Sequence, residues 1–322
     1  MRQFPRPIVL VSRCLEFDSV RYNGQLVRSQ IVRDMIPYVD FIKVCPEVDI
    51  GMGVPRNPLR IIKKDGKYRL IQQKTGEDFT EKMNTFSVKF LGDLGDIDGF
   101  IFKGLSPSVG LDDVKVYSKM SMSPVIERTA GLFAKYVIAK YPGNPMEENE
   151  RLRNLHIRHH FLTQLYTFTT FRQVKAEKSL RALTRFHKNN RFLLMSYDDE
   201  LLKEMSELVG SGSEINELFI NYEGLLKRVV RKPGSLDLKL AVVRNMFSMF
   251  EDVGQDENSF FEYTLKRYID NRISWDAAIE MLRLFAFCSF GENAYEDTFL
   301  YPYPEELKAL VDVDREKDYW DK

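Results

Sequence analysis

The run Ile8-Val9-Leu10-Val11-Ser12-Arg13-Cys14 is a short β-rich apolar segment that passes directly into an arginine and a cysteine. Two later segments, Tyr38 to Val44 and Gly99 to Lys103, have the same form and also end in polar clusters. Helical patterns lie between them, around Val27 to Ile36 and from Phe79 to Phe90. Strands that alternate with helices are typical of an α/β layer, so we expect a mostly parallel sheet.

The pattern changes at Tyr141-Pro142-Gly143-Asn144-Pro145, which has the composition of a linker. Just before it, Pro124 to Lys140 is predicted to form one helix. After it the strand signals vanish and about seven helical segments follow. We therefore expect two domains, an α/β domain over residues 1–143 and an all-α domain over residues 144–322.

The composition is that of an ordinary globular protein, with 44% hydrophobic and 29% charged residues among 322. No apolar run approaches the ~20 residues that span a bilayer, and we expect a cytoplasmic protein without a membrane partner. Basic and acidic residues balance at 47 each, so affinity for nucleic acid requires a local patch. Three widely spaced cysteines, Cys14, Cys45 and Cys288, do not form a disulfide framework, and remain thiols, metal ligands or nucleophiles.

The three strand ends predict one shared site. In a parallel sheet the carboxyl ends of the strands lie on one edge, and ligands bind in the crevice outside it. Cys14 follows the first strand, Cys45 and Glu47 follow the second, and Ser106 follows the third. A cysteine after a strand is also a common small core residue. The spacing of 31 residues between Cys14 and Cys45 is by itself no metal signature.

Ordered motifs in the first half resemble the thiouracil desulfidase family, an iron-sulfur enzyme domain, over about residues 6 to 140. The second half is similar to the YbgA-type domain, which is fused to such desulfidases in some bacterial proteins. Fused proteins of this layout are implied to remove sulfur from 4-thiouridine in transfer RNA (tRNA). The first domain would carry out the chemistry and the second would hold the RNA. The residues of the first resemblance are Ser12-Arg13-Cys14-Leu15, Arg21-Tyr22-Asn23-Gly24, Cys45-Pro46-Glu47-Val48, Gly51-Met52-Gly53-Val54-Pro55-Arg56 and Ser106-Pro107-Ser108, and those of the second are Glu150-Arg151-Leu152, Arg158, Phe186-His187-Lys188, Arg191-Phe192-Leu193-Leu194-Met195 and Tyr301-Pro302-Tyr303-Pro304-Glu305-Glu306-Leu307.

The resemblance implies a 4Fe-4S cluster held by three thiolates, with one open iron that binds the substrate sulfur as a Lewis acid. Carried over, Cys14 and Cys45 are cluster ligands. Glu47 exchanges protons with water and the ring, and Ser106 hydrogen-bonds a small thiolated base. The alternative for Glu47, from the residues alone, is a plain solvated carboxylate or a helix-end charge.

The chain departs from the family pattern at two positions. Val109 stands where the family has the third cysteine, and a valine side chain cannot ligate iron. Asn23 stands where the family usually has aspartate. Two thiolates would hold a labile cluster unless Ser108, Asp112 or Cys288 completes it, and Cys288 lies in an apolar helical run that indicates a core residue. The alternative is a non-catalytic RNA-binding or interaction protein that has lost a complete cluster site.

A basic stretch in the second half favours RNA binding. Arg151 to Arg191 holds ten Lys or Arg residues, one acid, and all four histidines. Arginine and lysine bind phosphates, and histidine offers a stacking face, so Arg158, Arg172, His187 and Lys188 are the candidate RNA-binding residues. The alternative is a solvated surface whose charges are balanced by the acidic run at residues 198–200.

Other enzyme classes have no motif in this chain. His156 and His160 form an i,i+4 pair without the intervening glutamate of His-Glu-x-x-His, which does not favour a zinc-protease site. There is no phosphate-binding Gly-x-x-x-x-Gly-Lys loop, dinucleotide fingerprint or nucleophile-elbow serine. ATPase, dehydrogenase and hydrolase functions therefore have no support.

Overall fold

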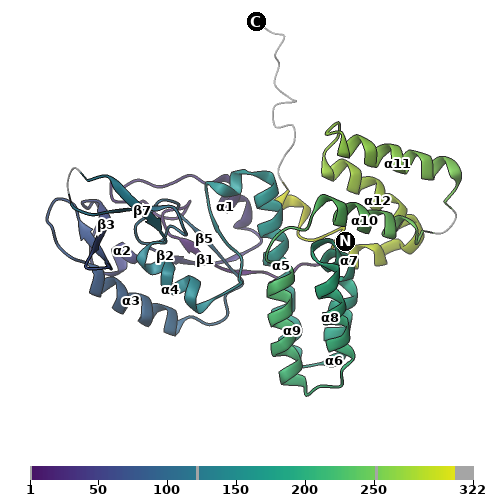
Figure 1. Ribbon diagram of the computed structural model, residues 1–322, viewed down its shortest axis with the longest axis horizontal. Helices are drawn as coiled ribbons and strands as arrows, with labels where there is room; N and C mark the ends of the chain where they lie inside the picture. Colours follow the sequence, from purple (N-terminus) through teal and green to yellow (C-terminus); the bar gives the residue numbers. More distant parts are fainter. Residues whose placement is uncertain (1, 121–122, 251–252, 309–322) are drawn as a thin grey trace, which may run out of the picture. The chain divides into compact units, whose positions relative to one another are not determined.

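The structure is a computed structural model that describes residues 2–120, 123–250 and 253–308 (Figure 1). It divides into two compact units. The sheet unit is Arg6–Leu165 with the segment that starts at Pro304, and the helical unit is Tyr166–Tyr303 with the residues up to Pro5. The end of the second predicted domain, residues 309–322, lies outside the described residues.

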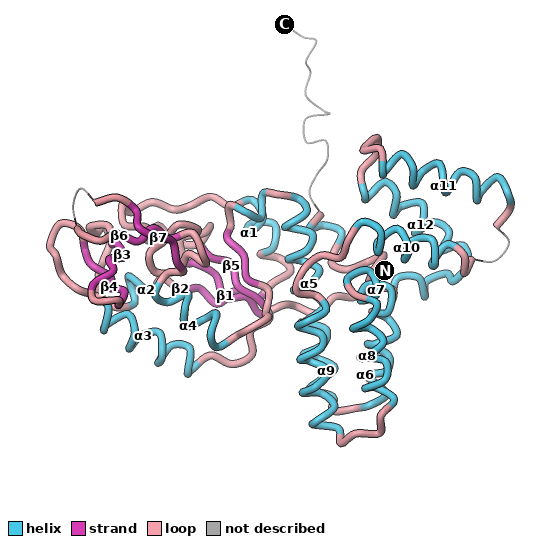
Figure 2. Tube along the Cα trace, viewed as in Figure 1, coloured by secondary structure: helices cyan, strands magenta, loops and turns pink. Residues whose placement is uncertain are grey.

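The first sheet is parallel and contains the three strands predicted around the site. Its order is β2-β1-β5-β8, formed by β1 (Ile8–Ser12), β2 (Asp40–Val44), β5 (Gly99–Phe102) and β8 (Met146–Glu148), and every neighbouring pair is parallel (Figure 2). The predicted α/β class with a parallel sheet is confirmed. Strand β8 follows Pro145, where no strand was predicted, because a strand of three residues is too short to show an alternating pattern.

The second sheet is mixed, with the order β4-β3-β6-β7. Strand β3 (Leu59–Lys64) pairs parallel with β6 (Val114–Tyr117), whereas β4 (Lys67–Gln72) and β7 (Val125–Thr129) pair antiparallel with their neighbours. The prediction of a continuous helix from Pro124 was wrong in its first part. Three of the residues 125–129 are β-branched, namely Val125, Ile126 and Thr129, and the segment pairs with β6 as a strand. The helix therefore begins later, at Leu132.

Both sheets share one core with the longer helices of the sheet unit. Helix α3 (Thr80–Asp93) packs beside α4 (Leu132–Lys140), and the shorter α1 (Gln30–Met35) and α2 (Pro46–Asp49) follow β1 and β2 along the chain (Figure 1). Buried side chains from both sheets and from α3 and α4 form a single cluster, which fixes the strand ends relative to each other. Its members include Leu10, Phe100 and Phe102 of the first sheet, Ile61, Leu70 and Val116 of the second, and Met83, Leu91 and Phe133 of the helices.

The second half of the chain is helical, as predicted. Two buried clusters hold it together, one among α5 to α9 and one among α10 to α12. No helix within the described residues is both long and apolar enough to cross a membrane. The elements are η1 (Arg151–Arg153), α5 (Leu155–Glu177), α6 (Leu180–Asn189), α7 (Arg191–Tyr197), α8 (Asp199–Gly210), α9 (Ile215–Val229), α10 (Leu236–Phe247), α11 (Gln255–Ile269), α12 (Trp275–Phe290), η2 (Gly291–Glu296) and η3 (Glu305–Leu307).

Candidate functional site

A cavity of about 530 Å³ lies at the carboxyl edge of the first sheet. The loops after β1, β2 and β5 all line it, because these strands run parallel and end side by side. Cys14, Cys45, Glu47 and Ser106 are all lining residues. The structure therefore brings together the four residues that the strand ends nominate from sequence.

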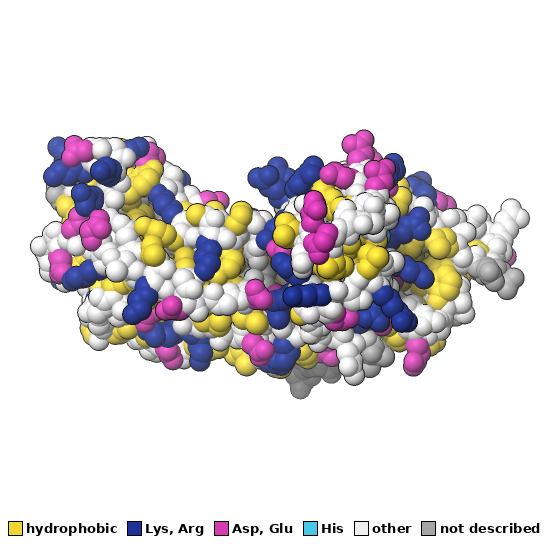
Figure 3. Space-filling view, turned by 90° about the horizontal axis from the view of Figure 1, so that it is seen from below, with side chains coloured by type: hydrophobic (Ala, Val, Ile, Leu, Met, Phe, Trp, Pro, Cys, Tyr) yellow, Lys and Arg dark blue, Asp and Glu magenta, His cyan; other side chains and the backbone are white. Residues whose placement is uncertain are grey.

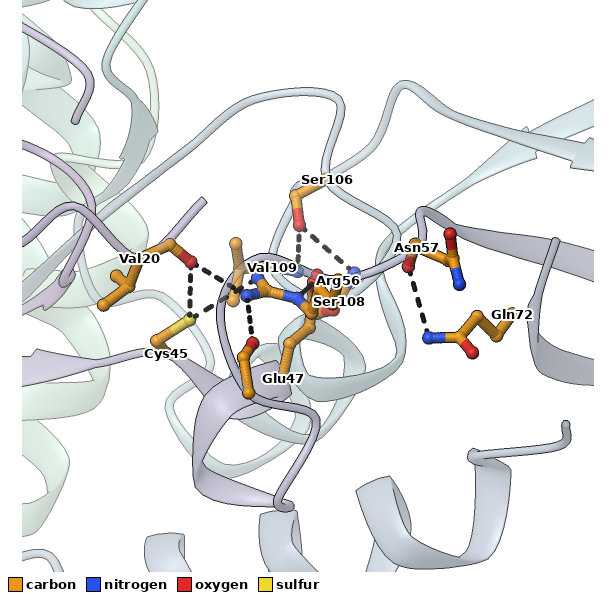
Figure 4. Close-up of polar contacts among 10 residues, drawn as sticks. Val20, Cys45, Glu47, Arg56, Asn57, Gln72, Ser106, Ser108 and Val109 are labelled. Carbon is orange, nitrogen blue, oxygen red and sulfur yellow. Dashed lines mark hydrogen bonds and ion pairs between the residues drawn. The ribbon is translucent and has the colours of Figure 1, made fainter. Parts of the chain in front are cut away.

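Glu47 is the centre of a polar network in the cavity wall. It lies in α2, which starts at Pro46, with one residue between it and the end of β2. The first position of a helix suits proline because its missing N–H needs no partner there. One carboxylate oxygen lies 2.7 Å from Nε of Arg56, and the other accepts a 2.6 Å hydrogen bond from the Ser108 hydroxyl (Figure 4). The exposed fractions are only 5% for the Arg56 side chain and 13% for that of Glu47. The pair is therefore largely shielded from water.

Arg56 connects this network to a further loop. Its Nη1 atom donates to the carbonyl oxygens of Val20 at 3.0 Å and Gly53 at 3.1 Å. Its Nη2 atom lies 3.9 Å from the sulfur of Cys45. Arg56 was assigned no role from sequence, and Ser108 was considered only as a group that could complete the cluster, although both lie inside the motifs that carry the family resemblance.

The two cavity cysteines are thiols in the protein alone. Burial raises the pKa of Cys14 to about 11, with a smaller contribution from Cys45, while Lys103 and Arg21 act in the opposite direction. Burial is also the main cause that raises the pKa of Cys45. The Cys45 sulfur lies 3.9 Å from the carbonyl oxygen of Val20. Both side chains are half-buried, so each sulfur combines a partly apolar environment with access to the cavity.

Ser106 shapes the turn after β5. Its hydroxyl oxygen accepts hydrogen bonds from the backbone nitrogens of Ser108 at 3.3 Å and Val109 at 3.4 Å. An acceptor role in both bonds leaves the hydroxyl hydrogen of Ser106 for a ligand. The same turn places the Ser108 hydroxyl toward Glu47 (Figure 4).

The donor set does not match a 4Fe-4S cluster held by three thiolates. Val109 lines the cavity and is 5% exposed, but its side chain has no atom that can bind iron. The Ser108 hydroxyl is already bonded to Glu47, and Asp112 is not a lining residue. Within the described ranges, no group of three or more His, Cys, Asp or Glu residues could hold a metal ion. Two thiols, those of Cys14 and Cys45, are therefore the thiols of the described cavity lining.

Cys288 does not occupy the position expected for it. The sequence predicts a core residue, whereas the structure exposes Cys288 on α12 of the helical unit. The residues buried on that helix are Ala278, Ile279, Leu282, Arg283 and Ala286. Because a helix repeats every 3.6 residues, position 288 lies away from the face that these residues form. Cys288 is an exposed thiol of the second unit and not part of the cavity lining.

The four candidate RNA-binding residues differ in exposure. His187 is half-buried, with Nδ1 3.0 Å from the Tyr222 hydroxyl and Nε2 3.0 Å from the Ser206 hydroxyl. Burial, and then Arg191, lower the pKa of His187. Lys188 is exposed.

The two candidate arginines are less exposed to solvent than Lys188. Arg158 is half-buried, and its Nε atom donates to the carbonyl oxygen of Leu152 at 3.0 Å. Arg172 is also half-buried. Of the four candidates, Lys188 is therefore the one that presents its charge most fully to solvent.

The fold and the site define an α/β protein with a thiol-lined ligand cavity at the carboxyl edge of a parallel sheet. Residues 9–149 match the 2-thiouracil desulfurase family, and residues 191–304 match a protein family of unknown function, DUF1722. The uncharacterised protein YbbK of Bacillus subtilis (strain 168) is 34% identical over 110 residues, which are 32% of this chain and 73% of that protein. The chain belongs to the 2-thiouracil desulfurase family, and the resemblance seen in both halves of the sequence is confirmed.

One solved structure is also similar to this chain. It is described as a 4Fe-4S-dependent thiouracil desulfidase, TudS, with a TM-score of 0.34 and 21% sequence identity. The similarity covers 48% of this chain and 98% of that one.

Proposed function

We propose that the sheet unit binds a thiolated uracil base in its cavity and replaces the sulfur with oxygen, and that the base is the 4-thiouridine of a tRNA. The observation that carries this proposal is that one cavity is lined both by two cysteine thiols and by the Arg56–Glu47–Ser108 network. A volume of about 530 Å³ suits a nucleobase or nucleoside, since small-molecule sites are typically about 300–1,000 Å³.

The lining supplies what a thiolated pyrimidine needs. Apolar side chains, including Val44, Leu59 and Pro107, offer contact for the faces of the ring. The Ser106 hydroxyl can donate to a ring carbonyl. The sulfur atom on the ring is soft and polarisable, so it can make favourable contacts with the sulfur atoms of Cys14 and Cys45 in the cavity lining.

The reaction is a hydrolysis without net electron transfer. Water adds its oxygen to the carbon that carries sulfur, the carbon–sulfur bond breaks, and the sulfur leaves as hydrogen sulfide. Glu47 accepts one proton from the water and returns it to the departing sulfur, while Arg56 and Ser108 hold the carboxylate in place. The second proton of the water passes from the new oxygen to the hydrosulfide as the carbonyl forms. No step of this proposal passes through an iron-sulfur cluster, because the donor set of this chain does not match one.

An exposed basic stripe on α6 supports tRNA as the carrier of the base. Arg181, Arg185 and Lys188 are exposed and lie at i, i+4 and i+7, on one face of the helix. Two of the three acids in the run 198–200 make other contacts. Asp198 caps α8 by accepting from two backbone nitrogens, and Asp199 pairs with Lys203 at 2.8 Å. A row of free cations of this kind binds phosphates.

A second candidate function is a non-catalytic protein that binds thiolated RNA. Val109 favours it, because a buried valine stands where the family pattern implies a ligand. Such a protein would retain the cavity and the basic stripe without turnover. The two candidates differ in whether bound 4-thiouridine loses its sulfur.

The deciding experiment is a single-turnover assay with anaerobically purified protein in excess over tRNA that contains 4-thiouridine. Sulfide release and loss of the thiocarbonyl absorbance are measured, together with the iron content of the protein. The desulfidase proposal expects sulfide in proportion to the thiolated tRNA, and none from tRNA that carries uridine. Tight binding without sulfide would establish the non-catalytic candidate, and absence of both binding and sulfide would exclude both.

A further inference from the structure

The outward face of the second sheet is strongly basic. In a strand, alternate residues point to opposite sides of the sheet. Leu59 and Ile61 of β3 face the core and are 8% and 0% exposed, so Arg60 and Lys64 lie on the other face. Residues that pair across two strands lie on the same face of the sheet. Arg69 pairs with Ile62 and Lys67 pairs with Lys64, so both belong to the outward face. Lys115 of β6 also lies on this face, because its neighbour Val116 pairs with the core residue Ile61.

A hollow of about 610 Å³ lies on this face, lined by Lys64, Lys67, Arg69 and Lys119 among others. Two acids are also in its lining. Asp78 pairs with Arg69 at 3.5 Å, and Asp65 lies in the turn between β3 and β4. The three lysines have no acidic partner within the described ranges, so the hollow carries excess positive charge. Figure 3 shows dark blue Lys and Arg side chains, with some magenta Asp and Glu among them, at the left of the view, where the part of the sheet unit labelled β3 and β4 in Figure 2 lies.

A groove that borders the cavity is lined by two members of this face, Arg60 and Lys115. It has a volume of about 250 Å³ and shares the lining residues Leu59, Gln73, Leu105 and Pro107 with the cavity. Arg60 and Tyr117 line the groove, and the Arg60 guanidinium lies 3.9 Å from the centre of the Tyr117 ring. All three hollows belong to the sheet unit, so the basic face, the groove and the cavity are parts of one compact body.

We propose that this face binds the backbone of a single-stranded segment of RNA and so presents one nucleotide of that segment to the cavity. This inference rests on the proposed function, whose substrate it extends from a base to a base within an RNA strand. A free base has no phosphate, so it would leave the lysines unused. A row of cations with an aromatic–guanidinium pair beside it is the combination that single-stranded nucleic acids require, because phosphates pair with the cations and bases stack on the planar groups.

The test compares two triple variants of the full-length protein. Lys64→Gln, Lys67→Gln and Lys119→Gln remove three charges from the hollow. The matched control removes three exposed charges of the same unit outside the three hollows, at Arg28, Lys43 and Lys89. The probes are a single-stranded RNA of about six nucleotides with one 4-thiouridine, which fits known site sizes, and the free 4-thiouridine nucleoside.

Fluorescence anisotropy over a salt series measures RNA binding, and equilibrium dialysis measures nucleoside binding. The hollow variant should bind RNA at least tenfold more weakly, with the slope of log affinity against log salt reduced by about 2, because each single-strand phosphate contact contributes about 0.7. The control should retain the wild-type affinity and slope. Nucleoside affinity should be the same in all three proteins.

Two results would overturn this inference. The first is that the hollow variant keeps the wild-type RNA affinity and the wild-type slope of log affinity against log salt. The second is that polyglutamate of the same total charge as the RNA displaces it, which would indicate an acidic protein as the partner. Failure of the proposed function gives a different result. In that case wild type binds no nucleoside and releases no sulfide, while the effect of the three lysines on RNA affinity persists.

Discussion

The hydroxyl of Ser108 donates a 2.6 Å hydrogen bond to the carboxylate of Glu47, which joins the loop after β5 to the helix after β2. Arg56 holds the other carboxylate oxygen at 2.7 Å. A carboxylate held from both sides has a defined orientation in the cavity wall. Its position is therefore set by the fold before any substrate binds.

Replacement of Glu47 by glutamine tests its role in proton transfer. Glu47→Gln keeps the size of the side chain and an oxygen for Arg56, but it cannot exchange a proton at neutral pH. A general acid–base role predicts a loss of about 10²–10⁴ in the rate of single-turnover sulfide release. The melting temperature should fall only slightly. The matched control is Glu81→Gln, an exposed carboxylate on α3, which should leave both quantities unchanged. Equal rates for Glu47→Gln and wild type would leave Glu47 a structural residue.

A cavity lined by only two thiols among the described residues predicts poor iron loading by the wild-type protein and a gain from Val109→Cys. A cysteine at this position places a third sulfur in the cavity wall beside the loops of Cys14 and Cys45. Iron and sulfide content after anaerobic reconstitution should rise, and a broad visible absorbance should appear. The control is Val109→Ser, because serine is close to cysteine in size but has no thiol. This variant should not gain iron or sulfide.

The same reconstitution assigns the other two ligands. In the Val109→Cys background, Cys14→Ser or Cys45→Ser should abolish the gain, whereas Cys288→Ser should not, because Cys288 is exposed on α12. Equal loading of Val109→Cys and Val109→Ser would show that position 109 does not contribute a ligand. Full loading of wild type would show that another group completes the site.

The strand ends could be predicted from sequence because their signals are local. A short apolar run such as Ile8–Ser12, ending in polar residues, needs no partner to be recognised, and parallel pairing then places its loop beside the others. The edge strand β8 and strand β7 escaped prediction because their structure depends on the neighbour with which they pair. The Arg56–Glu47 pair escaped it too, because ion pairs across loops follow from the tertiary fold.

Histidine 187 shows why composition is a weaker guide than geometry. The basic stretch suggests a solvent-facing ring, yet both ring nitrogens of His187 lie within hydrogen-bond distance of Tyr222 and Ser206. The exposed partners of Lys188 are Arg181 and Arg185, which a helical projection of residues 180–189 would have placed on one face.

The buried environment of His187 predicts a pH-dependent stability. Burial, and then Arg191, hold the pKa of His187 in the folded protein below its usual value of 6.5. The unfolded chain therefore takes up a proton first as the pH falls, and the stability that neutral His187 contributes is lost as the pH drops through 6.5 toward the folded pKa.

The measurement is the melting temperature of wild type minus that of His187→Gln between pH 8 and pH 5. This difference should shrink as the pH falls, because glutamine does not titrate. Burial raises the pKa of Asp297 to about 6, which acts in the opposite direction, but this effect is present in both proteins and cancels. A difference that stays constant over the range would show that folding does not shift the pKa of His187.

The stripe on α6 predicts the salt dependence of tRNA binding. Arg181, Arg185 and Lys188 have no acidic partner among the residues described, so their full charges are available to phosphates. Charge reversal of all three to glutamate should weaken tRNA binding and flatten its salt dependence, since each phosphate contact contributes about one unit to the slope of log affinity against log salt. The control reverses three other exposed cations of the helical unit, Lys232, Lys266 and Arg272. The control variant changes the net charge by the same amount. If the slope of log affinity against log salt falls equally in both variants, the effect is due to overall charge and not to the stripe on α6.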